Sequence, residues 1–152
     1  MSDGRATKTR SRFRLQIGVA INIRADAEIV WRLLTDAAGF PRWNSSVTSI
    51  EGTIAAGETI KVRVPLAPKR TFSPKVSVFE RPARMVWQEG NPVFKGVRTF
   101  ALTRRTDGTT DFSMVEVYTG LMLPLIAGSL PDFTPAFETY AADLKREAER
   151  GN

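Results

Sequence analysis

Residues 121–150 constrain the fold more than any other stretch, because they carry an apolar stripe at helical spacing. The stripe comprises Ile126, Leu130, Phe133, Phe137, Tyr140 or Ala141, Leu144 and Ala148. Steps of three and four residues place these side chains on one face of a helix, and most charged residues between them fall on the other faces. A face so wide must be buried. Since most of residues 13–121 have strand patterns, we expect the helix to pack on a sheet.

Two prolines, Pro131 and Pro135, divide this stretch. Proline fits the first turn of a helix but breaks its interior. We therefore predict that the long helix begins near Pro131 or Thr134. Residues 121–129 are predicted to form a separate, shorter turn or helix.

Alternation of apolar and polar residues predicts seven strands. They span residues 13–23, 47–51, 60–66, 70–80, 84–89, 94–104 and 109–121. Between the first two strands, Asp26 and Glu28 place negative charge where a helix start favours it. That helix is predicted to end at Gly39, and a second short helix or turn follows at residues 40–44. The expected order is one strand, two short helices, six strands and a long helix, which is an α+β fold.

The hairpin around Asp107-Gly108 has two candidate registers. A two-residue Asp-Gly loop pairs Thr106 with Thr109 and turns Phe112 outward. A three-residue loop at residues 106–108 puts Gly108 in the left-handed position that such loops need. The second register gathers the aromatic residues on one face, so we favour it. It also places Arg98 directly opposite Glu116 on the inward face.

The net charge of +6 is concentrated at the amino terminus. Residues 1–14 contain five Lys and Arg against one Asp, a net charge of +4, which leaves +2 for the rest of the chain. We expect residues 1–12 to be a flexible basic tail, and we expect no specific nucleic-acid binding. Whether the tail has a role is left open.

The chain contains no His and no Cys. This excludes a zinc site, a thiol nucleophile and a Ser-His-Asp triad, and we expect no metal and no cofactor. No run of 18 apolar residues is present, so no transmembrane segment is predicted. The basic amino terminus lacks the apolar stretch of a secretory signal, and we expect a cytoplasmic protein. The length fits one domain, here residues 13–150.

Several short motifs occur in an order that resembles the START-like or SRPBCC superfamily, whose members have the helix-grip fold of the birch-pollen allergen. The motifs are INIRADAEIVWRLLTD at residues 21–36, FPRWN at 40–44, VTSIEG at 47–52, MVW at 85–87, GVRTF at 96–100 and EVYTG at 116–120. They look most like the polyketide cyclase/dehydrase and lipid-transport branch. The resemblance implies a seven-stranded curved antiparallel sheet gripping the long carboxyl-terminal helix, with an apolar cavity between them.

Arg98 and Glu116 are the sharpest candidates for a functional role. Since an isolated charge among apolar side chains is costly, the two are expected to pair. The pair either fixes the sheet register or anchors a ligand carboxylate or carbonyl. The predicted ligand-binding residues are Trp43, Trp87, Phe94, Arg98, Phe100, Phe112, Met114, Glu116, Tyr118, Phe133, Phe137 and Tyr140. For the tyrosines and tryptophans, plain core packing is the alternative.

Three functions fit these patterns. The leading hypothesis is binding of a hydrophobic or amphipathic small molecule, lipid-like or polyketide-like, without catalysis. The first alternative is a polyketide aromatase/cyclase-type enzyme that orients a poly-ketone with Arg98 and Tyr118. The second is an interaction module that fills its cavity with its own side chains and docks its basic tail on an anionic surface. The sequence leaves the oligomeric state open.

Overall fold

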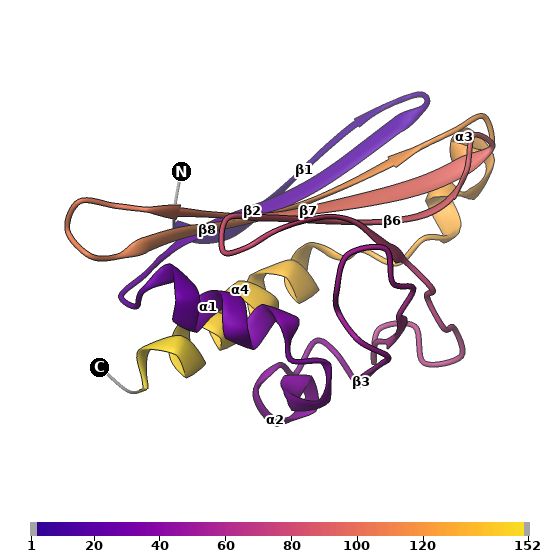
Figure 1. The fold of residues 1–152 in the computed structure, drawn as a ribbon. Helices are drawn as coiled ribbons and strands as arrows, with labels where there is room; N and C mark the ends of the chain where they lie inside the picture. The colour runs from indigo at the N-terminus through magenta and orange to yellow at the C-terminus, as the bar shows by residue number, and fades with distance from the viewer. Residues whose placement is uncertain (1–2, 151–152) are drawn as a thin grey trace.

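A six-stranded antiparallel sheet forms one layer of the structure, and the helices lie against one of its faces (Figure 1). The structure is a computed structural model, and residues 3–150 are described. In spatial order the strands are β1 (Asp3–Ser11), β2 (Arg14–Ile23), β8 (Thr110–Thr119), β7 (Phe94–Arg104), β6 (Arg84–Asn91) and β5 (Lys75–Glu80). A separate two-stranded sheet pairs β3 (Ser49–Glu51) with β4 (Lys61–Arg63).

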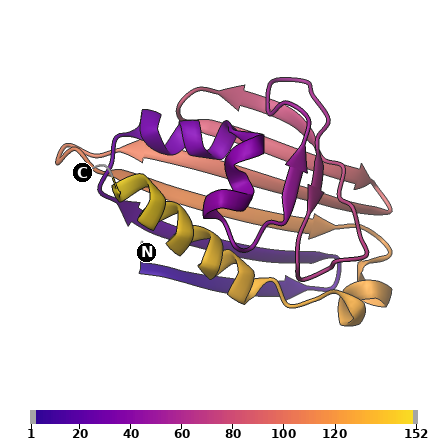
Figure 2. The ribbon, with the colours of Figure 1, turned by 90° about the horizontal axis from the view of Figure 1, so that it is seen from below.

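The helices follow the predicted order. After β2 come α1 (Ala27–Thr35), the short 3-10 turn η1 (Ala37–Gly39) and α2 (Phe40–Trp43). After β8 come α3 (Leu123–Ile126), the turn η2 (Ala127–Ser129) and the long helix α4 (Thr134–Glu149). Figure 2 shows α1 and α4 side by side under the same face of the sheet. The predicted α+β class, with a large antiparallel sheet and a long carboxyl-terminal helix, is confirmed.

The expectation of seven strands in one sheet is wrong in detail. The segment between α2 and β5 leaves the main sheet, and its two short strands pair with each other. An isolated bridge between Thr59 and Lys75 ties this segment to the start of β5, and a second one joins Val62 to Phe72 within the segment. Pro65, Pro68 and Pro74 lie within it, and since proline has no backbone N–H to donate, they interrupt longer pairing.

The prediction of a flexible tail is also wrong for residues 3–11, which form the edge strand β1. This strand pairs with β2 along its length, with a shift in register between Asp3 and Ala6. The backbone N–H of Ala6 also donates to the Glu138 carboxylate of α4 at 2.9 Å. The charged residues that suggested a tail are common on edge strands, where they discourage pairing with other chains.

The favoured register of the β7–β8 hairpin is confirmed. Arg98 lies opposite Glu116 and Phe100 opposite Met114. Gly108 has φ +86°, and the Arg105 N–H donates to the Thr109 carbonyl at 2.8 Å. The three-residue loop therefore sets which side chains of both strands face the helix.

The proline boundary at α4 is confirmed as well. Pro135 lies in the first turn of α4, and the Asp132 carboxylate accepts a hydrogen bond from the Thr134 N–H at 3.1 Å. The apolar stripe of α4 is buried against the sheet, at Phe137, Tyr140, Ala141, Leu144 and Ala148. Within residues 3–150, no helix is both long enough and apolar enough to cross a membrane.

Candidate ligand-binding pocket

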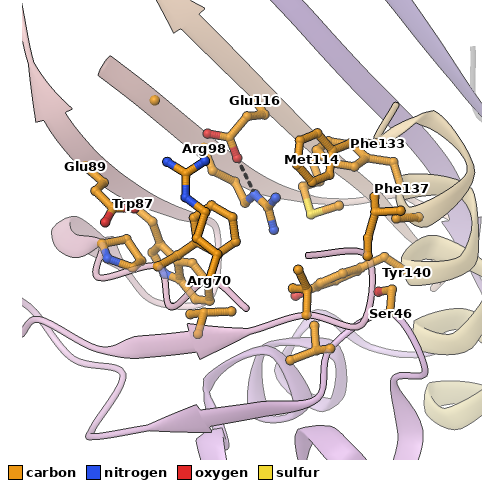
Figure 3. Close-up of a pocket in the computed structure, with 18 of the residues that line it drawn as sticks. Ser46, Arg70, Trp87, Glu89, Arg98, Met114, Glu116, Phe133, Phe137 and Tyr140 are labelled. Atoms are coloured by element: carbon orange, nitrogen blue, oxygen red, sulfur yellow. Dashed lines mark hydrogen bonds and ion pairs between the residues drawn. The ribbon is translucent and has the colours of Figure 1, made fainter. Parts of the chain in front are cut away.

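A pocket of about 280 Å³ lies between the sheet, α4 and the segment that carries β3 and β4 (Figure 3). The sheet contributes Trp87, Glu89, Phe94, Arg98, Met114, Glu116 and Tyr118. The start of α4 and the residue before it contribute Phe133, Ala136, Phe137 and Tyr140. The third wall consists of Ser46, Val47, Ile50, Val62, Val64, Leu66, Arg70, Phe72 and Pro74. The lining is therefore mostly apolar, with a small group of charged residues.

The register of β7 and β8 brings the polar residues of the sheet together. Gly96 lies opposite Tyr118, two residues from the Arg98–Glu116 pair. A Cβ atom at Gly96 would lie only 3.1 Å from Glu116 Oε2 and 3.2 Å from the Tyr118 ring. Because Gly96 has no side chain, Glu116 and Tyr118 have room on the pocket side of the sheet.

Arg98 and Glu116 form an ion pair inside the pocket. Arg98 Nε donates to Glu116 Oε1 at 2.7 Å, and the two side chains are 22% and 11% exposed. Burial raises the pKa of the Glu116 carboxyl, and Arg98 offsets this only in part. Burial works to lower the pKa of Arg98, but the favourable interactions of the guanidinium, of which the attraction to Glu116 is the largest, together raise the pKa, so the guanidinium stays charged.

The guanidinium of Arg98 keeps donors available. Its carbon lies 5.0 Å from the centre of the Phe137 ring, a cation–π distance. Among residues 3–150, Glu116 is its hydrogen-bond partner, through Nε alone. The two terminal nitrogens therefore remain free to donate to an oxygen atom of a bound molecule.

Two further donors in the pocket wall are buried without a partner. These are the hydroxyl of Tyr140 and Nε1 of Trp87, which have no hydrogen-bond partner within residues 3–150. Figure 3 shows the Tyr140 side chain extending from α4 into the pocket. Burial raises the pKa of both Tyr140 and Tyr118 well above the ordinary value, so each hydroxyl keeps its proton. Unpaired buried donors are rare, since each costs free energy.

Nine of the twelve predicted ligand-binding residues line the pocket. Trp43, Phe100 and Phe112 do not; they are buried in the core. All three pack around the Tyr140 ring, with centroid distances of 6.1 Å, 6.4 Å and 6.4 Å. The three residues therefore support a pocket residue instead of lining the pocket.

The third wall was missed by sequence reasoning. Its apolar residues, such as Val62, Val64 and Leu66, alternate clearly, and this pattern predicted a strand of the main sheet. The alternation identifies an inward face, but it does not indicate which layer the strand joins. A strand that folds across the pocket has the same pattern as one that extends the sheet.

Asp143 was also missed as a buried residue. Its carboxylate accepts hydrogen bonds from the backbone N–H and the hydroxyl of Ser45, both at 2.8 Å. Arg146 donates to its other oxygen at 2.6 Å. Burial works to raise the pKa of Asp143, but the hydrogen bonds from Ser45 and Arg146 outweigh it and lower the pKa. This contact joins α4 to the chain directly before Ser46, a residue of the pocket wall.

A curved antiparallel sheet, a long carboxyl-terminal helix and a pocket between them define the chain as a helix-grip protein. The sequence matches the family described as "Polyketide cyclase / dehydrase and lipid transport" over residues 14–149, and the chain belongs to this family. A comparison with curated proteins found no match.

Solved structures with the same fold come from several bacteria. A START superfamily protein from Mycobacterium smegmatis is 16% identical with a TM-score of 0.65, over 90% of this chain and 99% of that one. A Rhodobacter sphaeroides protein is 20% identical with a TM-score of 0.67, over 93% and 96% of the two chains. A Helicobacter pylori protein is 13% identical with a TM-score of 0.69, over 88% and 86%. At these identities the similarity shows the fold alone.

Proposed function

We propose that this protein binds a hydrophobic or amphipathic small molecule, lipid-like or polyketide-like, in the pocket and does not transform it. The observation that carries the proposal is the placement of Arg98. Its guanidinium faces a pocket with mostly apolar walls, and only Nε is engaged by Glu116. Such a site suits a ligand with an apolar body and one carboxylate or carbonyl group, because the apolar walls bind the body and the free nitrogens bind the oxygen.

The unpartnered donors support the same kind of ligand. An acceptor oxygen near Tyr140 or Trp87 would satisfy a buried group that otherwise costs free energy. The size of the pocket restricts the choice. About 280 Å³ is at the lower end of the roughly 300–1,000 Å³ typical of small-molecule sites, which favours a compact ligand.

An aromatase/cyclase-type activity is the second candidate, because Arg98 and Tyr118 both line the pocket. Together they would polarise a ketone by donating hydrogen bonds to its oxygen. The raised pKa of Tyr118 makes it a poorer proton donor in a transfer step, which favours binding over catalysis.

The test is incubation of the purified protein with a panel of fatty acids and aromatic polyketides, followed by native mass spectrometry. The bound compound is then extracted and compared with the compound added. Binding without transformation predicts a retained and unaltered ligand. If the wild type converts the compound and a folded Arg98→Met variant does not, the result would favour the aromatase/cyclase-type enzyme instead.

A pocket-filling variant locates the site. Ala136→Trp places an indole in the pocket and should abolish retention of the ligand. Ala142→Trp is the matched control, because Ala142 lies on the same helix and is exposed. Equal retention by both variants would show that the ligand binds elsewhere.

A further inference from the structure

Five large apolar side chains are exposed together at one end of the molecule. They are Phe13, Val93, Leu121, Met122 and Leu125, and we call them the tip patch. Leu121 and Leu125 are the most exposed, at 72% and 76%. In the whole of residues 3–150 only two other large apolar side chains, Ile29 and Leu66, are exposed. Most of the exposed apolar surface of this kind is thus concentrated at this end.

The tip patch is assembled from three segments that are distant in sequence. Phe13 lies in the β1–β2 turn, Val93 in the β6–β7 turn and the other three residues after β8. The Gly120 N–H donates to the Phe13 carbonyl at 3.3 Å, and the Met122 N–H donates to the Val93 carbonyl at 3.1 Å. Figures 1 and 2 both show α3 beside these turns, at the end of the sheet opposite the β7–β8 hairpin.

The charged residues within the segments that form the tip patch are all basic, and Glu89 and Asp132 lie directly outside these segments. The three segments that form it, residues 8–16, 90–96 and 117–131, contain five Lys and Arg and no Asp or Glu. Lys8 approaches Asp132 at 3.9 Å. The other four cations, Arg10, Arg12, Arg14 and Lys95, form no ion pair with any residue in 3–150. Arg12 lies over the Phe13 ring at 5.2 Å, so a cation and an apolar group are presented together.

We infer that the tip patch docks the protein on an anionic lipid membrane. Protruding Leu, Met and Phe side chains partition into the boundary between headgroups and acyl chains, and neighbouring Lys and Arg are attracted to anionic headgroups. The charge of the tip complements that surface, because the same segments that carry the apolar residues carry basic ones and no carboxylate. A large exposed apolar patch also marks an interaction site in its own right. This docking is independent of the proposed pocket ligand.

The test is sedimentation of the protein with vesicles of two compositions. One is pure phosphatidylcholine, and the other has equal parts of phosphatidylcholine and phosphatidylglycerol. The protein should bind the anionic vesicles and bind the neutral ones far less. Binding should weaken strongly at about 1 M salt, where the screening length is about 3 Å. No binding to anionic vesicles at low salt would overturn the inference.

Two double variants separate the apolar and charged contributions. Leu121→Glu/Leu125→Glu should reduce the partition coefficient at least about 100-fold, because it removes inserted groups and adds negative charge. Arg10→Gln/Arg12→Gln should reduce it about 25-fold, since each basic residue contributes about fivefold near an anionic surface. The matched controls are Ile29→Glu on α1 and Lys61→Gln/Arg63→Gln on β4, which lie outside the patch. Equal loss in variants and controls would overturn the inference.

A single fluorophore tests whether the tip enters the bilayer. The chain has no cysteine, so Leu125→Cys provides one labelling position. The emission of an environment-sensitive dye at this position should shift to shorter wavelength on anionic vesicles. The emission of the same dye at Thr106→Cys, in the hairpin at the opposite end of the sheet, should not shift.

Light scattering measures the molar mass of the wild type and of the Leu121→Glu/Leu125→Glu variant in solution. A dimer that the variant dissociates would assign the patch to self-association and overturn membrane docking.

Discussion

Arg98 on β7 and Glu116 on β8 are direct cross-strand neighbours, joined by a hydrogen bond of 2.7 Å from Arg98 Nε to Glu116 Oε1. Both side chains line the pocket, and both are largely withdrawn from solvent. The Arg98–Glu116 contact therefore joins the two strands of the hairpin and also forms the polar part of the pocket wall. Measurements of unfolding and of ligand retention can test these two roles separately.

Removal of one partner of this pair should be costly. Arg98→Ala leaves the Glu116 carboxylate buried and unpaired, and the free energy of unfolding should fall by about 3–5 kcal/mol in urea denaturation. Arg98→Met/Glu116→Leu should recover most of that loss, because it removes both charges. Arg84→Ala is the matched control: it breaks the exposed cross-strand pair with Glu80 and should change stability little. Equal losses in the two single variants would contradict a buried pair.

The Asp143 contact should make stability depend on acid pH. Its pKa is lowered in the folded state, so the unfolded state binds more protons and stability rises with pH across that range. The contribution is complete above the ordinary carboxyl pKa and is lost as the pH falls through the lowered value. Asp143→Ala should cost about 1–3 kcal/mol at neutral pH, because it leaves the Ser45 N–H without its partner. Denaturation curves from acid to neutral pH test both points, and an unchanged pH profile in the variant would contradict the assignment.

Gly120 is needed where the chain turns from β8 toward α3. Its φ is +137°, and an added Cβ would lie 2.1 Å from the carbonyl oxygen of Val93. Gly120→Ala should therefore lower the free energy of unfolding by at least about 1–3 kcal/mol. At Gly128 an added Cβ meets nothing within 4 Å, so Gly128→Ala is the control and should be nearly neutral. Thermal unfolding of both variants, followed by circular dichroism, makes the comparison.

Tyr140 should tolerate loss of its hydroxyl but not of its ring. Because the hydroxyl is buried without a partner, Tyr140→Phe should leave the stability unchanged or raise it by about 1 kcal/mol. Tyr140→Ala should lower it by about 3–5 kcal/mol, since it removes the ring that Trp43, Phe100 and Phe112 surround. A marked loss in Tyr140→Phe, measured by urea denaturation, would reveal a hydrogen bond to that hydroxyl.

Features set by local periodicity could be predicted from the sequence. The α+β class, the start of the long helix at the prolines and the three-residue hairpin loop all follow from spacing and turn chemistry within a few residues. The Arg98–Glu116 pair followed from the hairpin register, because one fixed pair in an antiparallel ladder determines all the others. The same register predicted Phe94, Met114 and Tyr118 as pocket residues, whereas Phe133, Phe137 and Tyr140 followed from the helical spacing of the last thirty residues.

The corrections concern contacts between distant segments. Residues 3–11 have a charged pattern that fits a tail as well as an edge strand, and their strand structure depends on β2 and on Glu138 of α4. The pattern of residues 60–66 does not show which layer the strand joins. Asp143 has the spacing of a surface position, and only the approach of Ser45 makes it a buried one.

By itself, the sequence determined which faces are apolar and where elements begin and end, because these properties depend on neighbours along the chain. Tertiary structure decided what each face meets. It separated the pocket residues from Trp43, Phe100 and Phe112, folded the third wall across the pocket and gathered the tip patch from three turns. Those outcomes depend on how layers stack in space, and the period of a sequence pattern carries no information about that.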